Sequence, residues 1–99
     1  MVVVVFRSRL KPGIEQEIER ADARMAALAA TMPGYISYRQ YAASDGEGVA
    51  VVEFESHETV AAWRAHPEHR EAQRLAKERW FSEYRITVCD SVRDYSFKA

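Results

Sequence analysis

PGYISYRQYAASDGEGVAVVEF, residues 33–54, is the stretch that decides the fold. Residues 35–41 are rich in aromatic and β-branched side chains, which favour β-strands. Residues 44–48 read Ser-Asp-Gly-Glu-Gly, a composition typical of turns, and residues 49–54 are again β-branched and apolar. Two short strands joined by a turn predict a β-hairpin.

The sequence before the hairpin predicts a strand followed by a helix. Residues 2–9 begin with four valines, whose side chains alternate between the two faces of a strand. Lys11-Pro12-Gly13 interrupts this strand. Apolar residues then recur at spacings of four and three, which is a helical stripe, at Ile14, Ile18, Ala21, Met25 and Leu28. The charged residues between them, Asp22 included, are expected to face solvent, and Met32-Pro33-Gly34 is expected to end the helix.

The sequence after the hairpin predicts a broken helix and a last strand. Ser56 is a candidate N-cap, because its hydroxyl can accept a backbone N–H of the next turn. A helix is expected from His57, and Pro67 is expected to kink it or to start a new segment that runs to Trp80. Residues 83–97 predict a long strand with a bulge or bend near Asp90-Ser91.

The order of these elements is β-α-β-β-α-β. It predicts an α+β, ferredoxin-like fold with a four-stranded antiparallel sheet and two helices on one face. The valines on both faces of the first strand and the length of the last one predict that a second copy covers the open face. We therefore expect a homodimer.

Composition excludes several classes of protein. Ninety-nine residues predict one domain, residues 1–99. A net charge of −1 argues against nucleic-acid binding, which needs a basic surface. The apolar N-terminus is too short to span a membrane or to act as a signal, and the single cysteine suits a reducing compartment, so we expect a cytoplasmic protein without a membrane partner. The chain contains no asparagine.

Two motifs resemble a known family. Pro33-Gly34-Tyr35 leads into the second strand, and the run from Glu53 to His69, EFESHETVAAWRAHPEH, leads from the third strand into a helix. Both are similar to the antibiotic biosynthesis monooxygenase (ABM) family, over residues 2–97. The resemblance implies a dimeric α+β barrel with a binding cavity between the sheet and the helices of each subunit. Some members of the family oxidise aromatic compounds to quinones without a cofactor, others bind and degrade haem, and many have no known activity.

The resemblance places candidate site residues on the helices. Trp63 matches the family tryptophan, which in quinone-forming members works with an asparagine one turn earlier, where this chain has Thr59. In haem-degrading members, the positions of the helical histidine ligand and the first-strand asparagine fall here on Gln73 and near Ser8, neither of which is the required residue. His69 lies one turn before Gln73 on the same helical face and is the alternative, displaced ligand. The sequence thus lacks the asparagine that takes part in both quinone formation and haem degradation. Trp63 can equally be a core anchor.

The histidines offer a general base, because imidazole titrates near neutral pH. We expect His69 to act with Trp63 as a catalytic residue, and we expect the substrate to contact Thr59, His66, Gln73, Tyr38 and Arg7. His66 and His69 can share a helical face only if Pro67 does not break the helix between them, and no third ligand is evident nearby, so neither a metal nor a cofactor is expected. The strand arginines can alternatively lie at strand ends or pair with Glu53 and Glu55 across the sheet; they are Arg7, Arg9, Arg39 and Arg85. Cys89 is expected to be a small buried hydrophobe.

These observations favour a cofactor-independent monooxygenase that acts on a small aromatic or quinone-type compound. In such a reaction the protein positions and deprotonates the substrate, which then reduces O2 directly. The alternative is a non-catalytic dimer that binds a small ligand and has lost the catalytic residues. Haem binding or haem degradation is a third alternative.

Overall fold

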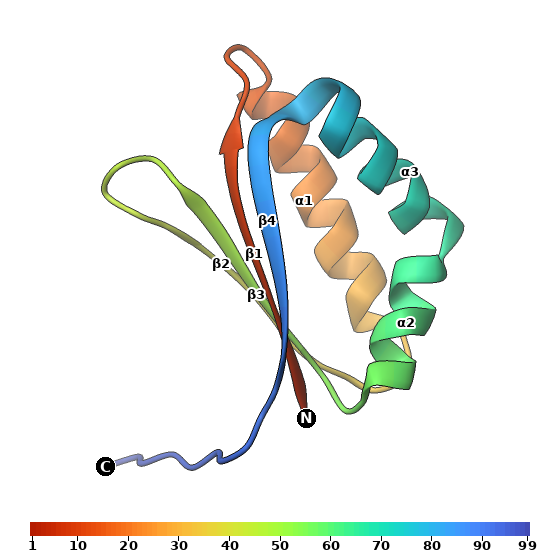
Figure 1. The fold of residues 1–99 in the computed structure, drawn as a ribbon, viewed down its shortest axis with the longest axis vertical. Coiled ribbons are helices and arrows are strands. Elements are labelled where there is room, and N and C mark those ends of the chain that lie inside the picture. Colours follow the sequence, from red (N-terminus) through yellow and green to blue (C-terminus); the bar gives the residue numbers. More distant parts are fainter.

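A computed structural model describes residues 1–99 and has the predicted βαββαβ order (Figure 1). The sheet is four-stranded and antiparallel, with the strand order β2-β3-β1-β4, and the helices lie on one side of it. This confirms the α+β ferredoxin-like prediction. The elements are β1 (Val2–Leu10), α1 (Glu15–Ala30), β2 (Tyr35–Ala42), β3 (Gly48–Phe54), α2 (His57–Ala65), α3 (Pro67–Leu75), the π-helical turn η1 (Ala76–Trp80) and β4 (Phe81–Asp90).

Strand register decides which side chains meet the helices. Val2 lies opposite Phe54 and Val4 opposite Val52, and all four are buried in one cluster with residues of α1 and α2. Because side chains alternate along a strand, the odd-numbered residues of β1 point to the other face. Val3 and Val5 therefore lie on the face that no helix covers, which we call the open face.

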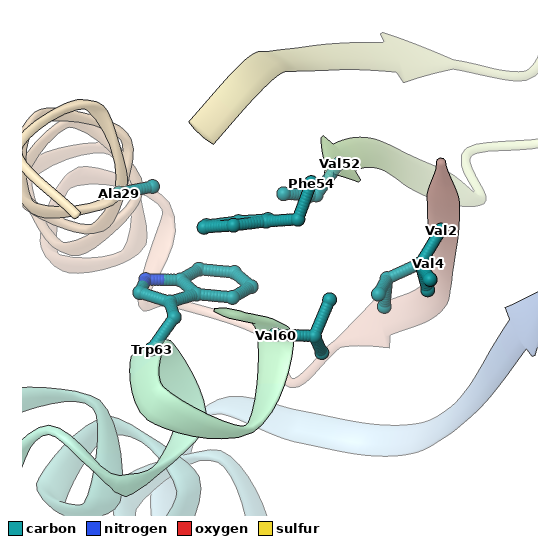
Figure 2. Close-up of a cluster of buried hydrophobic side chains, with 7 residues drawn as sticks. All are labelled: Val2, Val4, Ala29, Val52, Phe54, Val60 and Trp63. Carbon is teal, nitrogen blue, oxygen red and sulfur yellow. The ribbon is translucent and has the colours of Figure 1, made fainter. Parts of the chain in front are cut away.

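The apolar core consists of two separate clusters. Figure 2 shows the larger one, in which the indole of Trp63 lies against the ring of Phe54 between α1 and the sheet. The two ring centroids are 5.3 Å apart and the planes differ by 23°, an offset-stacked arrangement that aromatic pairs favour. The smaller cluster contains Ile18, Ala76 and Trp80 at the other end of α1. Only 12 of the 99 residues are fully buried, so the space between the clusters is not filled by a continuous core.

The helix boundaries follow the local sequence. The Ser56 hydroxyl accepts a hydrogen bond from the Thr59 N–H, and the Thr59 hydroxyl accepts one from the Ser56 N–H, which together form a capping box. Pro67 occupies the first turn of α3, after His66 has ended α2 with an extended ψ of 135°. No helix combines the length and the apolar character that a membrane span requires.

The last strand is shorter than the sequence suggested. β4 ends at Asp90, which pairs with Val2, the first residue of β1. One further hydrogen bond, from the Ser91 N–H to the Met1 carbonyl oxygen at 2.9 Å, follows the last pair. Residues 91–99 instead leave the sheet on the side away from the helices (Figure 1). The irregularity expected near Asp90-Ser91 is the end of the strand, and the actual shift in register lies between Arg9 and Leu10.

Candidate functional site

A cavity of about 370 Å³ lies between the sheet and the helices. Its wall includes Trp63 and Val52 from the larger cluster and Ile18 and Trp80 from the smaller one, so it occupies the gap between them. Nineteen of its 27 lining residues are hydrophobic, which suits a largely apolar ligand.

Trp63 and His69 form one stacked pair in this wall. Their ring centroids are 4.2 Å apart and their planes differ by 31°. The break at Pro67 turns the chain back, so that Nδ1 of His69, in α3, lies 3.2 Å from the carbonyl oxygen of Trp63, in α2. A carbonyl oxygen can only accept a hydrogen bond, so Nδ1 carries the proton and Nε2 of the neutral ring keeps a lone pair.

The surroundings keep this imidazole neutral. Burial lowers the pKa of His69 below its ordinary value of 6.5, and the neighbouring charges of Arg64 and His66 lower that pKa further. The hydrogen bond to the Trp63 carbonyl opposes these effects only in part. At neutral pH, His69 is therefore an unprotonated base at the cavity wall.

Trp63 also brings an unpaired donor to the site. Its side chain is buried, and Nε1 has no hydrogen-bond partner in the protein. Figure 2 places this nitrogen at the edge of the indole nearest α1. A buried N–H without a partner is costly, so a ligand oxygen that accepted its hydrogen bond would be favoured.

Three further polar side chains, from α1 and β2, line the cavity. Burial raises the pKa of Asp22, and the side chain of Gln40 lowers it in part through hydrogen bonding. Burial, together with the nearby Asp22 charge, raises the pKa of Tyr38 to about 12, so its hydroxyl stays protonated at neutral pH. The ring of Tyr38 meets that of Trp63 edge to face, with centroids 6.2 Å apart. This group therefore adjoins the Trp63–His69 pair.

The interpretation of Asp22 as a solvent-facing residue was wrong, because Asp22 lies in the cavity wall. Asp22 is four positions after Ile18 and three before Met25. Residues with these spacings share one face of a helix, so Asp22 lies on the same face as the apolar stripe. Gln40 was missed as well. It has the same parity along β2 as Tyr38, and that parity alone places both side chains on the helix-facing side.

The predicted site residues divide into two sets. Trp63, His69, Gln73 and Tyr38 lie together in the cavity wall, as does Ser8. The others lie elsewhere, where each has its own partner: Thr59 in the capping box of α2, His66 with Nδ1 accepting from the Glu68 N–H at 3.1 Å, and Arg7 in an ion pair with Glu47 at 3.1 Å.

Of the two alternatives for the strand arginines, pairing with Glu53 and Glu55 is not seen, whereas Arg7 and Arg9 do lie toward the end of a strand. Arg9 pairs with Asp45 at 2.8 Å and approaches Glu83 at 3.5 Å, whereas the Ser37 hydroxyl donates to Glu53. Register explains this, because Arg7 and Arg9 lie at the end of β1 that faces the β2–β3 turn, far from Glu53.

The three histidines do not converge. His57 pairs with Asp90 at 2.6 Å, His66 caps α3 and His69 lines the cavity. No three His, Cys, Asp or Glu side chains lie close enough together to hold a metal ion. Cys89 is half-buried on the open face, opposite Val3.

The fold and the cavity define a ferredoxin-like domain with an apolar pocket between sheet and helices, and with an aromatic–imidazole pair in its wall. The family model described as "Antibiotic biosynthesis monooxygenase" matches residues 1–75. The chain belongs to this family.

Three other proteins are similar to this chain in sequence or in fold. The uncharacterized protein YqjZ of Bacillus subtilis (strain 168) is 31% identical over 75 residues, which cover 76% of this chain and 66% of YqjZ, just under two thirds. The structure of Rv0793 from Mycobacterium tuberculosis superposes with a TM-score of 0.86 at 21% identity, covering 96% of this chain and 98% of that one. SnoaB from Streptomyces nogalater, described as a cofactor-independent oxygenase and solved as an asparagine-to-alanine variant, superposes with a TM-score of 0.79 at 23% identity, covering 94% of each chain.

Proposed function

We propose that this protein is a cofactor-independent monooxygenase that oxidises a small hydroxylated aromatic compound in the cavity. The observation that carries the proposal is the Trp63–His69 pair, in which an unprotonated imidazole lies against an indole in the wall of one apolar pocket. The unpaired indole N–H is buried beside it, on the side of α1. Membership of the monooxygenase family and the likeness to SnoaB support it.

The two side chains supply complementary steps. His69 accepts the acidic proton of a phenol or of an anthrone-type CH2 group at Nε2. Trp63 donates its Nε1–H to the oxygen on which negative charge develops, and the apolar wall strengthens that hydrogen bond. The electron-rich anion then reacts with O2 to form a hydroperoxide, which loses water. Overall, one CH2 group and one O2 become one C=O group and one H2O, and the substrate itself supplies the electrons.

Oxygen consumption tests this proposal. Purified protein is mixed with anthrone or with a phenol that has a free para C–H, and O2 uptake and quinone formation are followed for the wild type, for Trp63→Phe and for His69→Ala. We expect uptake in the wild type, and losses on the order of a hundredfold in His69→Ala and tenfold or more in Trp63→Phe. His57→Ala is the matched control, because His57 is exposed and lies outside the cavity. Ligand binding without O2 uptake across a panel of phenols would replace the oxygenase with a non-catalytic binding protein.

The residues present do not fit the haem chemistry of the family. The position that the resemblance assigns to the iron ligand is Gln73, whose amide nitrogen donates to the Arg64 carbonyl at 3.3 Å, and an amide is not a haem ligand. The first-strand position is Ser8. We derive no step through haem, and titration of the protein with haem should give no Soret shift.

We further propose that the protein works as a homodimer whose subunits meet through the open face. Four valines lie half-buried at the centre of that face, Val3 and Val5 on β1 with Val49 and Val51 on β3. The tail beyond β4 also exposes large apolar side chains, with Val92, Tyr95 and Phe97 each more than 80% exposed. A second copy of the chain would cover the valines and the apolar side chains of the tail. Large exposed apolar patches commonly mark such protein–protein interfaces.

A further inference from the structure

We propose that Asp22, Tyr38 and Gln40 form a second polar subsite that binds an additional hydroxyl group on the aromatic ligand. The inference rests on the proposed function in taking the same cavity as the ligand site. The subsite would select ligands by a second hydroxyl group, whereas the Trp63–His69 pair interacts with only one oxygen of the ligand.

Placement is the first reason. Asp22 belongs to α1 and the other two residues to β2, and the fold brings them to one part of the cavity wall. Each influences another electrostatically or by hydrogen bonding, so they act as one group. Tyr38 connects this group to the reacting pair through its edge-to-face contact with Trp63.

The hydrogen-bonding balance is the second reason. The side chains of Asp22, Tyr38 and Gln40 line the same cavity, and the Gln40 amide is near enough to influence the pKa of the other two groups. A carboxylate has room for several donors, and one amide cannot fill it. A buried carboxylate without enough donors is costly, so a donor from a ligand would be favoured there.

The chemistry of the group selects the ligand. A hydroxyl group can donate to the Asp22 carboxylate and at the same time accept from the Tyr38 hydroxyl or the Gln40 amide. A bare aromatic edge can do neither and would leave the carboxylate unsatisfied. A site built around a polar partner discriminates strongly against the analogue that lacks it. The ligand is therefore a ring system with at least two hydroxyl groups, one for each polar region of the cavity.

Binding measurements test the inference without turnover. Affinities of naphthol and of a set of dihydroxynaphthalene isomers are measured under anaerobic conditions by calorimetry or by quenching of tryptophan fluorescence. For the best isomer, we expect the wild type to prefer the diol over naphthol by about tenfold or more, the effect of a hydrogen bond to a charged group. Asp22→Asn should reduce that preference and Asp22→Leu should abolish it. Glu19→Gln, which removes an exposed carboxylate from the same helix, should leave it unchanged.

The outcomes separate this inference from the proposed function. Equal affinity for naphthol and every diol, or a preference that survives in Asp22→Leu, would overturn the inference even if the protein consumed oxygen. A diol preference that depends on Asp22 would support the subsite even if no oxygen uptake were seen. Circular dichroism of both Asp22 variants shows that they are folded, so a lost preference cannot be assigned to misfolding.

Discussion

At the scale of single residues, Asp22 links ligand binding to stability. Its pKa is raised in the folded protein above the ordinary 3.8, because burial disfavours the carboxylate. A raised pKa means that the stabilising contribution of this group is fully present below pH 3.8 and is lost as the pH rises through the folded value. The ionised form of this side chain therefore weakens the fold, which is common for residues that serve binding.

Replacing Asp22 by asparagine should stabilise the unliganded protein at pH 7. The amide has nearly the same shape and cannot ionise, so the cost of burying the charge disappears. We expect a higher melting temperature in calorimetry at pH 7, and a difference from the wild type that shrinks as the pH is lowered toward 3.8. The exposed Glu19→Gln should show no such trend. A melting temperature for Asp22→Asn that is lower than that of the wild type at pH 7 would contradict this account of the carboxyl.

His69 should make the fold sensitive to mild acid in the opposite sense. Its pKa is lowered below 6.5 on folding, so the unfolded chain binds its proton at a higher pH than the native state does. Stability from this residue is complete above pH 6.5 and falls as the pH drops from there to the lowered folded pKa. Urea unfolding across this range should show the wild type losing stability relative to His69→Gln. Because both proteins share all other titrating groups, parallel pH curves would show that His69 is not buried as described.

The same titration sets the pH dependence of the proposed reaction. The base is active when the imidazole is neutral, so kcat/KM should stay level down to pH 6.5 and fall only below it. An inflection above pH 6.5 would point to a different base.

At the scale of elements, the capping box of α2 holds the segment that carries Trp63. Ser56→Ala removes the acceptor of the Thr59 N–H and should reduce the free energy of unfolding by about 1 kcal/mol. Ser96→Ala, in the exposed tail, is the matched control and should change it by less than about 0.5 kcal/mol. Equal effects of the two substitutions in urea denaturation would show that the capping box does not stabilise the helix.

The turn before β2 depends on Gly34 for two reasons. Gly34 has a φ of +79°, which L-residues adopt at a cost, and a Cβ placed there would lie 2.6 Å from the side chain of Thr59. Gly13 has a similar φ of +85°, but nothing lies within 4 Å of its Cβ position. Gly13→Ala should therefore cost about 1 kcal/mol, and Gly34→Ala clearly more, in the same unfolding assay. If the two costs were equal, the close approach of Thr59 would be of no consequence.

The sequence predicted the elements well because each of them has a local cause. Spacing identified the stripe of α1, the Ser56 cap marked the start of α2, and Pro67 marked the start of α3. The predicted end of β4 was wrong, because an antiparallel strand pairs only as far as its neighbour extends. The last pair joins Asp90 to Val2, the first residue of β1. Local alternation in residues 91–97 carries no information about that neighbour.

The site was predictable only in part, for a related reason. Family resemblance pointed to Trp63, but the stacking of His69 on it depends on the angle between α2 and α3, which no spacing rule supplies. Asp22 and Gln40 come from different elements and meet only through the packing of α1 on the sheet. Thr59, chosen by position, is used for capping instead.

At the scale of the whole molecule, the hollow between the two core clusters connects fold and function. A chain of this size has little apolar surface to bury, and here part of it lines a cavity. Stability must then come from elsewhere, and the open face is the largest surface still available. On this face, Arg7 pairs with Glu47 and Arg9 with Asp45. Arg39, opposite Val51, and Arg85, opposite Arg7, have no ion-pair partner within the chain and flank the valines.

Dimerisation through the open face can be tested by a charge at its centre. Val51 lies on that face and points away from the helices, so Val51→Lys leaves the packing within one subunit intact. In a dimer, the same lysine would be buried against the partner, at a cost of at least about 2 kcal/mol for each subunit. Light scattering should give twice the chain mass of 11.4 kDa for the wild type and a monomer for Val51→Lys at micromolar concentration. Ala23→Lys adds the same charge on the exposed side of α1 and should remain dimeric, so a wild-type monomer or a dimeric Val51→Lys would remove the open face as the interface.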